Sequence, residues 1–430
     1  MFGYRDIIEE SVFQRLMTLD EDEIPVIIRA ENCDCADLEK CVRDKGGRIK
    51  YLLPLINSVA AYLPSVGVRS VAREEFINKI IYDELAHKLM DVASLTVGSD
   101  YANEYDLTGK GVTVAVIDTG VHPHSDLVTP TNRIIGFKDF VGKRTSPYDD
   151  DGHGTHVAGI VAGNGFSSQG KYMGIAPDAN ILGVKVLNQD GGGSISDVIA
   201  GIQWAVDNRS RYNVKVMTLS LGTKANKSYR EDPLCQAVEA AVNAGITVVT
   251  AAGNSGPERS TINSPANSPS AISVGAVDDR DITSPRDAKI ADFSSRGPTP
   301  DGFSKPDLLS PGVRINSLSH QGSQYTSLSG TSMATPIVAG CAALLYEQNP
   351  SLNPQGVKSL MTKHALSINQ NRDAQGAGIL DIRKILQDTN PTHKKPGTTP
   401  SRPIQSPQRN RSFFSDWFLV LLIVVLLIIL

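Results

Sequence analysis

Cysteine is scarce in this chain, which has five in 430 residues: Cys33, Cys35, Cys41, Cys235 and Cys341. The number is odd and the spacing is scattered, unlike the even set that a disulfide framework in a small secreted protein uses. We therefore expect reduced thiols. The first three cysteines leave a metal site as an alternative, but a structural zinc site needs four ligands and no fourth cysteine lies nearby.

A strong charge of either sign is also missing. The formal net charge is −4 and the pI is near 6.1, a balance that gives no reason to expect nucleic acid as a general partner. The first residues, "MFGYRDIIEESVFQRL", contain acids and have neither a basic start nor an apolar core. They do not resemble a secretory signal peptide.

One long apolar run is present, "WFLVLLIVVLLIIL" at residues 417–430. From Phe413 onward the stretch is 18 residues long, at the lower limit for crossing a hydrocarbon core of about 30 Å. It has no polar stripe, so we predict a C-terminal transmembrane helix, 413–430, rather than a buried core helix. Basic residues precede it, and the positive-inside rule then predicts a cell-membrane anchor with the rest of the chain facing the cytoplasm. These residues are Lys394, Lys395, Arg402, Arg409 and Arg411.

Composition changes along the chain predict five segments. An amphipathic helix is expected at 1–23, and a small α+β unit at 24–96 that includes the strand "IPVIIRA" and the helix "CADLEKCVRDKGG". The main body spans 97–388. A basic linker with five prolines follows at 389–412 and leads to the apolar tail at 413–430.

The main body alternates between strand and helix patterns. "GVTVAVIDTG", "NILGVKVL", "VKVMTLSLG" and "ITVVTAAGN" are typical of buried strands, whereas "HGTHVAGIVAG" and "DPLCQAVEAAVNAG" are typical of helices. Such alternation predicts an α/β fold, a doubly wound and mostly parallel sheet with helices on both faces.

Four polar residues lie where such a sheet places its functional sites, beyond the carboxyl ends of the strands. Asp118 and Asn254 each follow a strand, and His153 and Ser332 each begin a helix. Taken singly, each is more simply explained as a cap or turn residue. Together they supply a nucleophile, a base, a carboxylate that orients the base and an amide donor for an oxyanion. We therefore predict nucleophilic acyl transfer.

The stretch "SLSGTSMATP", residues 327–336, suits a nucleophile at a helix start. Gly330 leaves room for a substrate carbonyl beside the Ser332 hydroxyl. Ala334 and Ala339 allow the helix to pack closely beneath the site. Pro336 is expected in the first helical turn, where its missing N–H is not needed.

The blocks "VAVIDTGVHPHSDL", "DDDGHGTHVAGIVAG", "LSLG", "AAGNSGP" and "SGTSMATP" resemble the signature blocks of the subtilisin-like serine proteases, the subtilase family. The resemblance covers about residues 97–388. The "FSSRGP" and "KPD" segments make the chain most similar to the intracellular AprX-like subtilases. This resemblance implies a serine endopeptidase in which Asp118, His153 and Ser332 form the triad and Asn254 lies in the oxyanion hole.

The resemblance also implies how substrate and inhibitor bind. Ser220, Leu221 and Gly222 on one side, and Gly191, Gly192 and Gly193 on the other, would pair with a polypeptide in extended form. Residues 24–95 resemble the inhibitory propeptide of the family, which implies a zymogen cleaved between about residues 86 and 100. A permanent N-terminal domain without processing is the alternative.

No cofactor is expected for the chemistry, and structural calcium stays open. Asp126 matches one calcium ligand of secreted relatives, but the loop "NGFSSQGKYMG" lacks their asparagine-rich pattern. His156 follows His153 by three residues with no Glu between them, whereas a helical zinc protease needs His at i and i+4 around a Glu. Zinc catalysis is therefore disfavoured. A non-catalytic peptide-binding protein and an esterase on the same fold are the other functional hypotheses.

Overall fold

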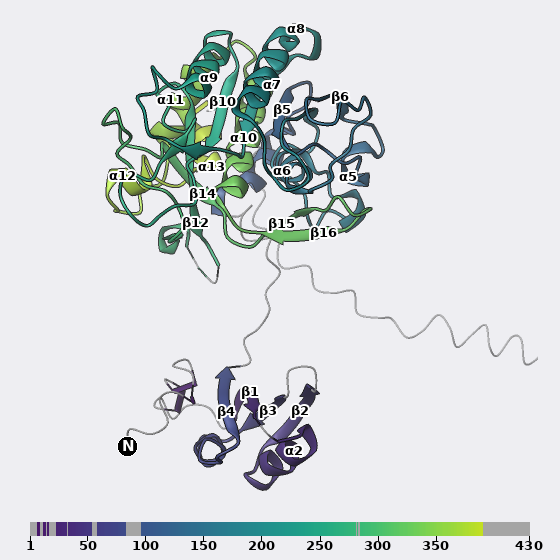
Figure 1. Ribbon diagram of the computed structural model, residues 1–430, viewed down its shortest axis with the longest axis vertical. Helices are drawn as coiled ribbons and strands as arrows, with labels where there is room; N and C mark the ends of the chain where they lie inside the picture. The colour runs from purple at the N-terminus through teal and green to yellow at the C-terminus, as the bar shows by residue number, and fades with distance from the viewer. Residues whose placement is uncertain are drawn as a thin grey trace, which may run out of the picture. The chain divides into compact units, whose positions relative to one another are not determined.

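The structure is a computed structural model, and it describes residues 7–8, 12–13, 15–16, 23–31, 33–53, 58–82, 96–280, 282 and 284–389. The chain divides into two compact units, residues 1–88 and 89–430 (Figure 1). Each unit has a hydrophobic core of its own. The two are described separately below.

The first unit is an antiparallel sheet with two helices packed on it. Its strands are β1 (Ile24–Ala30), β2 (Arg48–Leu53), β3 (Ser58–Leu63) and β4 (Ile77–Tyr82), in the order β2-β3-β1-β4. Helix α2 (Cys35–Asp44) packs against β2 and β3, and α3 (Ser65–Val71) packs against β3. Alternate residues of β1 are buried, as expected for a strand with one face on a core. The β-α-β-β-α-β order is the ferredoxin-like arrangement.

The second unit is built on a larger sheet of order β13-β12-β10-β8-β5-β7-β6, with β14 beside β12. All its neighbouring strands are parallel except β13, which is antiparallel to β12. The strands are β5 (Thr113–Asp118), β6 (Ile134–Asp139), β7 (Asn180–Lys185), β8 (Val214–Leu219), β10 (Thr247–Ala251), β12 (Ile272–Asp278), β13 (Lys289–Ile290) and β14 (Leu308–Pro311). The central strand β5 is buried along its whole length, because helices cover both faces.

Helices cover the sheet from two sides and create two cores. Helices α6 (His153–Ala162), α10 (Thr331–Gln348), α11 (Pro354–His364) and α13 (Ile382–Thr389) contribute to one core. Helices α7 (Ile195–Asp207) and α9 (Pro233–Asn243) contribute to the other and lie side by side (Figure 1). The predicted doubly wound α/β architecture is confirmed.

Shorter elements complete the second unit. They are the helices α5 (Ser125–Val128), α8 (Arg209–Tyr212) and α12 (Arg372–Gln375) and the 3₁₀ turns η2 (Ser99–Tyr105), η3 (Phe166–Ser168) and η4 (Pro285–Asp287). Strands β9 (Thr223–Lys224) and β11 (Asn263–Ser264) pair, as do β15 (Ile315–Leu318) and β16 (Tyr325–Leu328). The β15–β16 hairpin packs against α6 through β15.

Helix α10 differs from expectation at one residue. Pro336 is inside the helix rather than in its first turn, because α10 already begins at Thr331. A proline at this position cannot donate to the carbonyl of Ser332, four residues earlier. The Ser220 hydroxyl donates to that carbonyl instead, at 2.9 Å. The Ser332 carbonyl, which the proline leaves without a helical partner, therefore connects the start of α10 to the chain that follows β8.

The prediction of a C-terminal transmembrane helix is corrected here. Among the helices that the structure describes, none combines the length and the hydrophobicity of a membrane span. Residues 413–430, on which that prediction fell, lie outside the described part of the chain. The prediction relied on apolar composition alone, and composition does not by itself establish a helix. The membrane anchor and the cytoplasm-facing orientation inferred from it are therefore not retained.

Candidate active site

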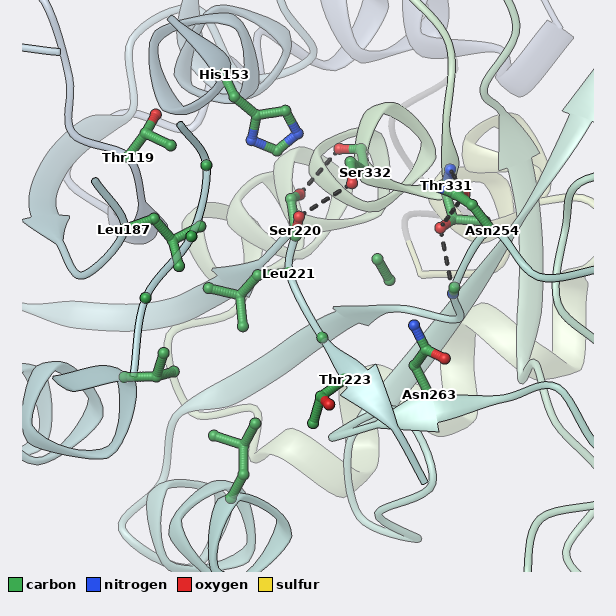
Figure 2. A pocket seen from close by; sticks show the side chains of 18 of the residues that line it. Thr119, His153, Leu187, Ser220, Leu221, Thr223, Asn254, Asn263, Thr331 and Ser332 are labelled. Atoms are coloured by element: carbon green, nitrogen blue, oxygen red, sulfur yellow. Dashed lines mark hydrogen bonds between the residues drawn. The ribbon is translucent and has the colours of Figure 1, made fainter. Parts of the chain in front are cut away.

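A cavity of about 680 Å³ lies at the carboxyl ends of the central strands (Figure 2). Nine of the ten predicted site residues line it: His153, Ser332, Asn254, Ser220, Leu221, Gly222, Gly191, Gly192 and Gly193. The tenth, Asp118, does not line the pocket but forms a hydrogen bond with His153, which does. Segments that are far apart in sequence thus meet because parallel strands end at the same edge of the sheet.

Asp118 and His153 form a hydrogen-bonded pair. Asp118 ends β5 and is fully buried, and its Oδ1 lies 2.7 Å from Nδ1 of His153. The Thr119 N–H also donates to this oxygen, at 2.8 Å. Burial by itself lowers the pKa of His153, but the nearby carboxylates, first of all Asp118, outweigh it and raise the pKa to about 9. The pair therefore stabilises a charged imidazolium.

Acidic side chains hold the helix turn that carries His153. Asp149 is buried and accepts hydrogen bonds from the N–H groups of Gly152 and Thr155 and from the Thr155 hydroxyl, at 2.6–2.9 Å. Asp151 accepts from the N–H of His153 at 2.9 Å. Two acceptors thus satisfy free N–H groups at the start of α6. Sequence analysis did not assign these roles, although three acids just before a helix are a capping signal.

Ser332 lies in the first turn of α10, on the same pocket as His153 (Figure 2). Its hydroxyl donates to the backbone carbonyl of Ser220 at 3.0 Å. Within the described residues no hydrogen bond joins Ser332 to His153, and none is found for the Ser332 N–H. The serine is thus anchored to the β8 end while its amide is open to the pocket.

The amide of Asn254 is oriented by Thr331. The N–H and the hydroxyl of Thr331 both donate to Oδ1 of Asn254, each at 2.9 Å. With its oxygen occupied in this way, the amide presents its nitrogen as a donor. A side chain at position 330 would place a Cβ 3.3 Å from that Nδ2, so Gly330 keeps the space beside the donor open.

The two side walls of the pocket present backbone groups. Among the described residues, no hydrogen bond is found for the backbone N–H and C=O of Leu221 or of Gly193. Asn188 holds the turn before Gly193 by accepting from the N–H groups of residues 190 and 192. A Cβ at Gly193 would lie 2.3 Å from the Val186 carbonyl oxygen, so this position requires glycine. Free groups on both walls suit an extended peptide between them.

Lys185 is a buried support beneath the site that sequence analysis did not identify. Its Nζ donates to the carbonyls of Thr119 and Leu187 at 2.6 and 2.8 Å and pairs with Asp150 at 2.6 Å. It therefore ties the chain after Asp118 to the end of β7. The signal was present in the sequence as one lysine within an otherwise apolar strand pattern, and such a residue needs polar partners when buried.

His156 and Asp126 do not form a metal site. His156 is fully buried, and its Nε2 lies 3.0 and 3.1 Å from the carbonyls of Ile315 and Thr326, contacts that tie α6 to the β15–β16 hairpin. Burial lowers the pKa of His156 to about 4.

The Asp126 carboxylate accepts from the Ser167 N–H and the Tyr325 hydroxyl at 2.9 and 2.8 Å. Because both carboxylate oxygens of Asp126 already accept hydrogen bonds, they are not arranged to bind calcium. Within the ranges that the structure describes, no group of three or more His, Cys, Asp or Glu side chains could hold a metal ion.

Comparison with known proteins agrees with this geometry. A sequence profile described as the subtilase family matches residues 109–379. The chain is 46% identical to "Serine protease AprX" of Bacillus subtilis (strain 168) over 344 residues, 74% of this chain and 76% of that protein. It is 33% identical to "Subtilisin E" of the same organism over 352 residues, 80% of this chain and 85% of that protein.

Solved structures agree as well. "Sphericase" has a TM-score of 0.56 and 34% identity, covering 64% of this chain and 93% of that one. "S41 Psychrophilic Protease" has a TM-score of 0.57 and 32% identity over the same shares of the two chains.

Proposed function

Because this chain belongs to the subtilase family and is a serine-type endopeptidase, we propose that it hydrolyses peptide bonds with Ser332 as nucleophile, His153 as general base and acid, and Asp118 as the group that orients His153. The observation that carries this proposal is the 2.7 Å contact between Asp118 Oδ1 and His153 Nδ1 at a pocket that Ser332 and Asn254 also line.

In the first half of the reaction, the Ser332 Oγ attacks the carbonyl carbon of the scissile bond, and its proton passes to Nε2 of His153. The oxyanion that forms accepts hydrogen bonds from the Asn254 amide and from the free Ser332 N–H at the start of α10. The C–N bond then breaks, His153 returns the proton to the leaving amine, and an acyl-enzyme remains on Ser332.

In the second half, water attacks the acyl carbon and gives its proton to His153. The bond to Ser332 Oγ breaks, the proton returns to that oxygen, and the carboxylic acid product leaves. Asp118 holds the imidazole in the tautomer that exposes Nε2 and stabilises the imidazolium in both halves. No cofactor takes part in any step.

The proposal requires a small rearrangement of Ser332. Its hydroxyl donates to Ser220 O and must turn toward His153 before attack. We propose that rotation about the Cα–Cβ bond of Ser332, from one staggered position to another, makes this change. A hydrogen bond between a catalytic nucleophile and its base often forms only when substrate binds.

Substrate would bind as an extended strand between the two walls. Leu221 and Gly193 offer unpaired backbone groups on opposite sides, so that a peptide can add as a strand by main-chain hydrogen bonds. This mode requires no particular side chain and therefore suits a protease that acts on many polypeptides.

We also propose that the first unit is the chain's own inhibitory propeptide. A propeptide is typical of the family, and residues 24–82 form a separate sheet with its own core. Val97 is fully buried in the core of the second unit, and a Cβ added at Gly98 would lie 3.2 Å from Cβ of Arg383. Cleavage before Thr96 would leave these contacts intact.

The test is Ser332→Ala in the full chain. We expect a protein with the thermal unfolding of the wild type that hydrolyses no casein or peptide amide and keeps its N-terminal unit, whereas the wild type yields a shorter form in N-terminal sequencing and mass measurement. Normal turnover by the variant would refute the catalytic proposal. Processing of the variant without added protease would refute self-cleavage.

A further inference from the structure

One buried carboxylate of the second unit has no part in the proposed reaction. Asp279 directly follows β12 and is only 2% exposed. Its Oδ2 is buried, and among the described residues no hydrogen-bond donor is found for this oxygen. An ionised carboxylate in such a place is costly unless a cation and hydrogen-bond donors satisfy it. Asp279 therefore has one oxygen without a partner in the described part of the chain.

The charged residues on either side of Asp279 do not satisfy it. Asp278 repels a second negative charge, and it holds Arg280 through both of its own carboxylate oxygens. Burial raises the pKa of Asp279 to about 6, and the attraction of Arg280 does not offset this effect. The ionised form of Asp279 would therefore be stabilised by a further cation.

The start of the second unit lies beside this carboxylate. The Thr96 hydroxyl donates a hydrogen bond to Asp279, and Thr96 is itself buried. The backbone nitrogen of a threonine is only a few covalent bonds from its hydroxyl oxygen, so the nitrogen of Thr96 is also close to Asp279. In the intact chain this nitrogen belongs to a peptide group, which carries no charge.

The chain that follows Thr96 is fixed to the second unit. Val97 is fully buried in the core of that unit, and η2, which begins at Ser99, packs against α13. A chain terminus created at Thr96 would therefore stay beside Asp279 when the first unit leaves.

We propose that processing leaves Thr96 as the first residue of the second unit, and that its new α-ammonium group forms a buried ion pair with Asp279. The inference rests on the proposed function, because it assumes that the enzyme cleaves its own chain between the two units. The ammonium group supplies both the positive charge and the donors that Oδ2 lacks.

The chemistry of cleavage provides this cation. Hydrolysis breaks the C–N bond before Thr96, and the hydroxyl of water goes to the carbonyl carbon. The nitrogen gains one proton from water and a second from the new carboxylic acid, so a carboxylate and an ammonium group result. Cleavage elsewhere in the segment 83–95 would leave additional residues between the ammonium group and Asp279. The pair is therefore specific to one cleaved bond.

The experiment compares intact and cleaved protein in the Ser332→Ala background, in which a trace of tagged wild type cleaves the chain and is then removed. N-terminal sequencing should find Thr96 as the first residue of the second unit, as in the self-processed wild type. In the intact chain, Asp279→Asn should leave the melting temperature of the second unit unchanged or raise it, because it removes an uncompensated charge. In the cleaved chain, the same substitution should lower that temperature by about 3–8 °C, because the ammonium group loses its partner.

Chemical labelling of the new terminus is a second readout. An α-amino group with an ordinary pKa of about 7.7–8.0 reacts with acetic anhydride near neutral pH, whereas an ion-paired ammonium group has a raised pKa and stays protonated. Peptide mass mapping of the cleaved protein should show acetylation of Thr96 about tenfold faster in the Asp279→Asn variant than in its parent.

Asp278→Asn is the matched control, because Asp278 is the neighbouring acid and is already paired with Arg280. This variant should keep the slow acetylation of Thr96, and its effect on the melting temperature should be the same before and after cleavage.

Three results would overturn the inference. They are a first residue other than Thr96 in the processed protein, equal rates of acetylation in the Asp279→Asn variant and its parent, and an equal effect of Asp279→Asn on the melting temperature before and after cleavage. A wild type that hydrolyses neither casein nor its own chain would instead contradict the proposed function, and the inference would fall with it.

Discussion

At the scale of single residues, the site depends on a concentration of negative charge around one imidazole. Asp118, Asp149 and Asp151 all act on His153 and raise its pKa. A protonated imidazole cannot accept the serine proton, so the same carboxylates that stabilise the imidazolium also keep the resting base charged at neutral pH. The enzyme should therefore require alkaline conditions for full activity.

The pH profile tests this account of His153. Because the neutral imidazole is the active form, kcat/KM should rise with pH and level off only above about 9, the raised pKa of His153. Asp151→Asn removes one carboxylate and should move the profile toward lower pH. A profile that levels off near pH 6.5, the ordinary pKa of histidine, would contradict the account.

The sequence was sufficient to propose Asp118, His153, Asn254 and Ser332 as site residues, because each occurs in a dense motif at a strand end or helix start, and the structure brings them together at one pocket. The residues that hold them were harder to identify. Lys185 and Asp149 act through hydrogen bonds to backbone groups of other segments, and no local pattern reveals such partners. The Ser332 hydroxyl bond to Ser220 also depends on a contact across 112 positions of sequence.

At the scale of elements, the start of α6 is the part of the fold that places His153, the proposed base. Its N-cap is Gly152, which has no side chain to satisfy the first N–H groups and has φ of 108°, a left-handed value that suits glycine. Asp149, which precedes the helix, accepts hydrogen bonds from two of these N–H groups, those of Gly152 and Thr155. The helix start therefore depends on a buried carboxylate rather than on an ordinary cap.

Asp149→Ala tests that dependence. We expect the free energy of unfolding to fall by about 2–4 kcal/mol, because several buried donors lose their acceptor. Burial opposes the charged form of Asp149, but its hydrogen bonds, first that of Thr155, outweigh burial and lower its pKa below 3.8. The stabilisation of the folded state by the Asp149 carboxylate is therefore fully present above pH 3.8. It is lost as the pH falls through the lowered pKa of Asp149 in the folded protein.

The measurement is urea unfolding at neutral pH, with activity measured in parallel. Asp190→Ala is the control, since this acid is exposed and should change stability by less than about 0.5 kcal/mol. Equal stability of the Asp149→Ala protein and the wild type would contradict the capping role.

Element order followed from the sequence, but some local details did not. Strand and helix patterns alternate clearly in 97–388, so the parallel sheet could be predicted from hydrophobic periodicity. The position of Pro336 inside α10 could not, because a proline in a helix needs another donor for the carbonyl that it leaves free. That donor, Ser220, directly follows β8 in the sequence.

At the scale of the whole molecule, the chain consists of two units with separate cores and different sheet types. An antiparallel ferredoxin-like unit precedes a parallel α/β unit that carries every proposed site residue. The prediction of a transmembrane helix at 413–430 was wrong at this scale, because it inferred a helix from an apolar run alone. The division into two units agrees with the zymogen proposed above.

Covalent labelling of the purified active protein tests the central claim most directly. Diisopropyl fluorophosphate should react once per molecule, abolish hydrolysis of casein, and leave its adduct on Ser332 in peptide mass mapping, while the Ser332→Ala protein stays unlabelled. Full activity after exposure to the reagent, or an adduct that abolishes activity from a residue other than Ser332, would contradict the claim.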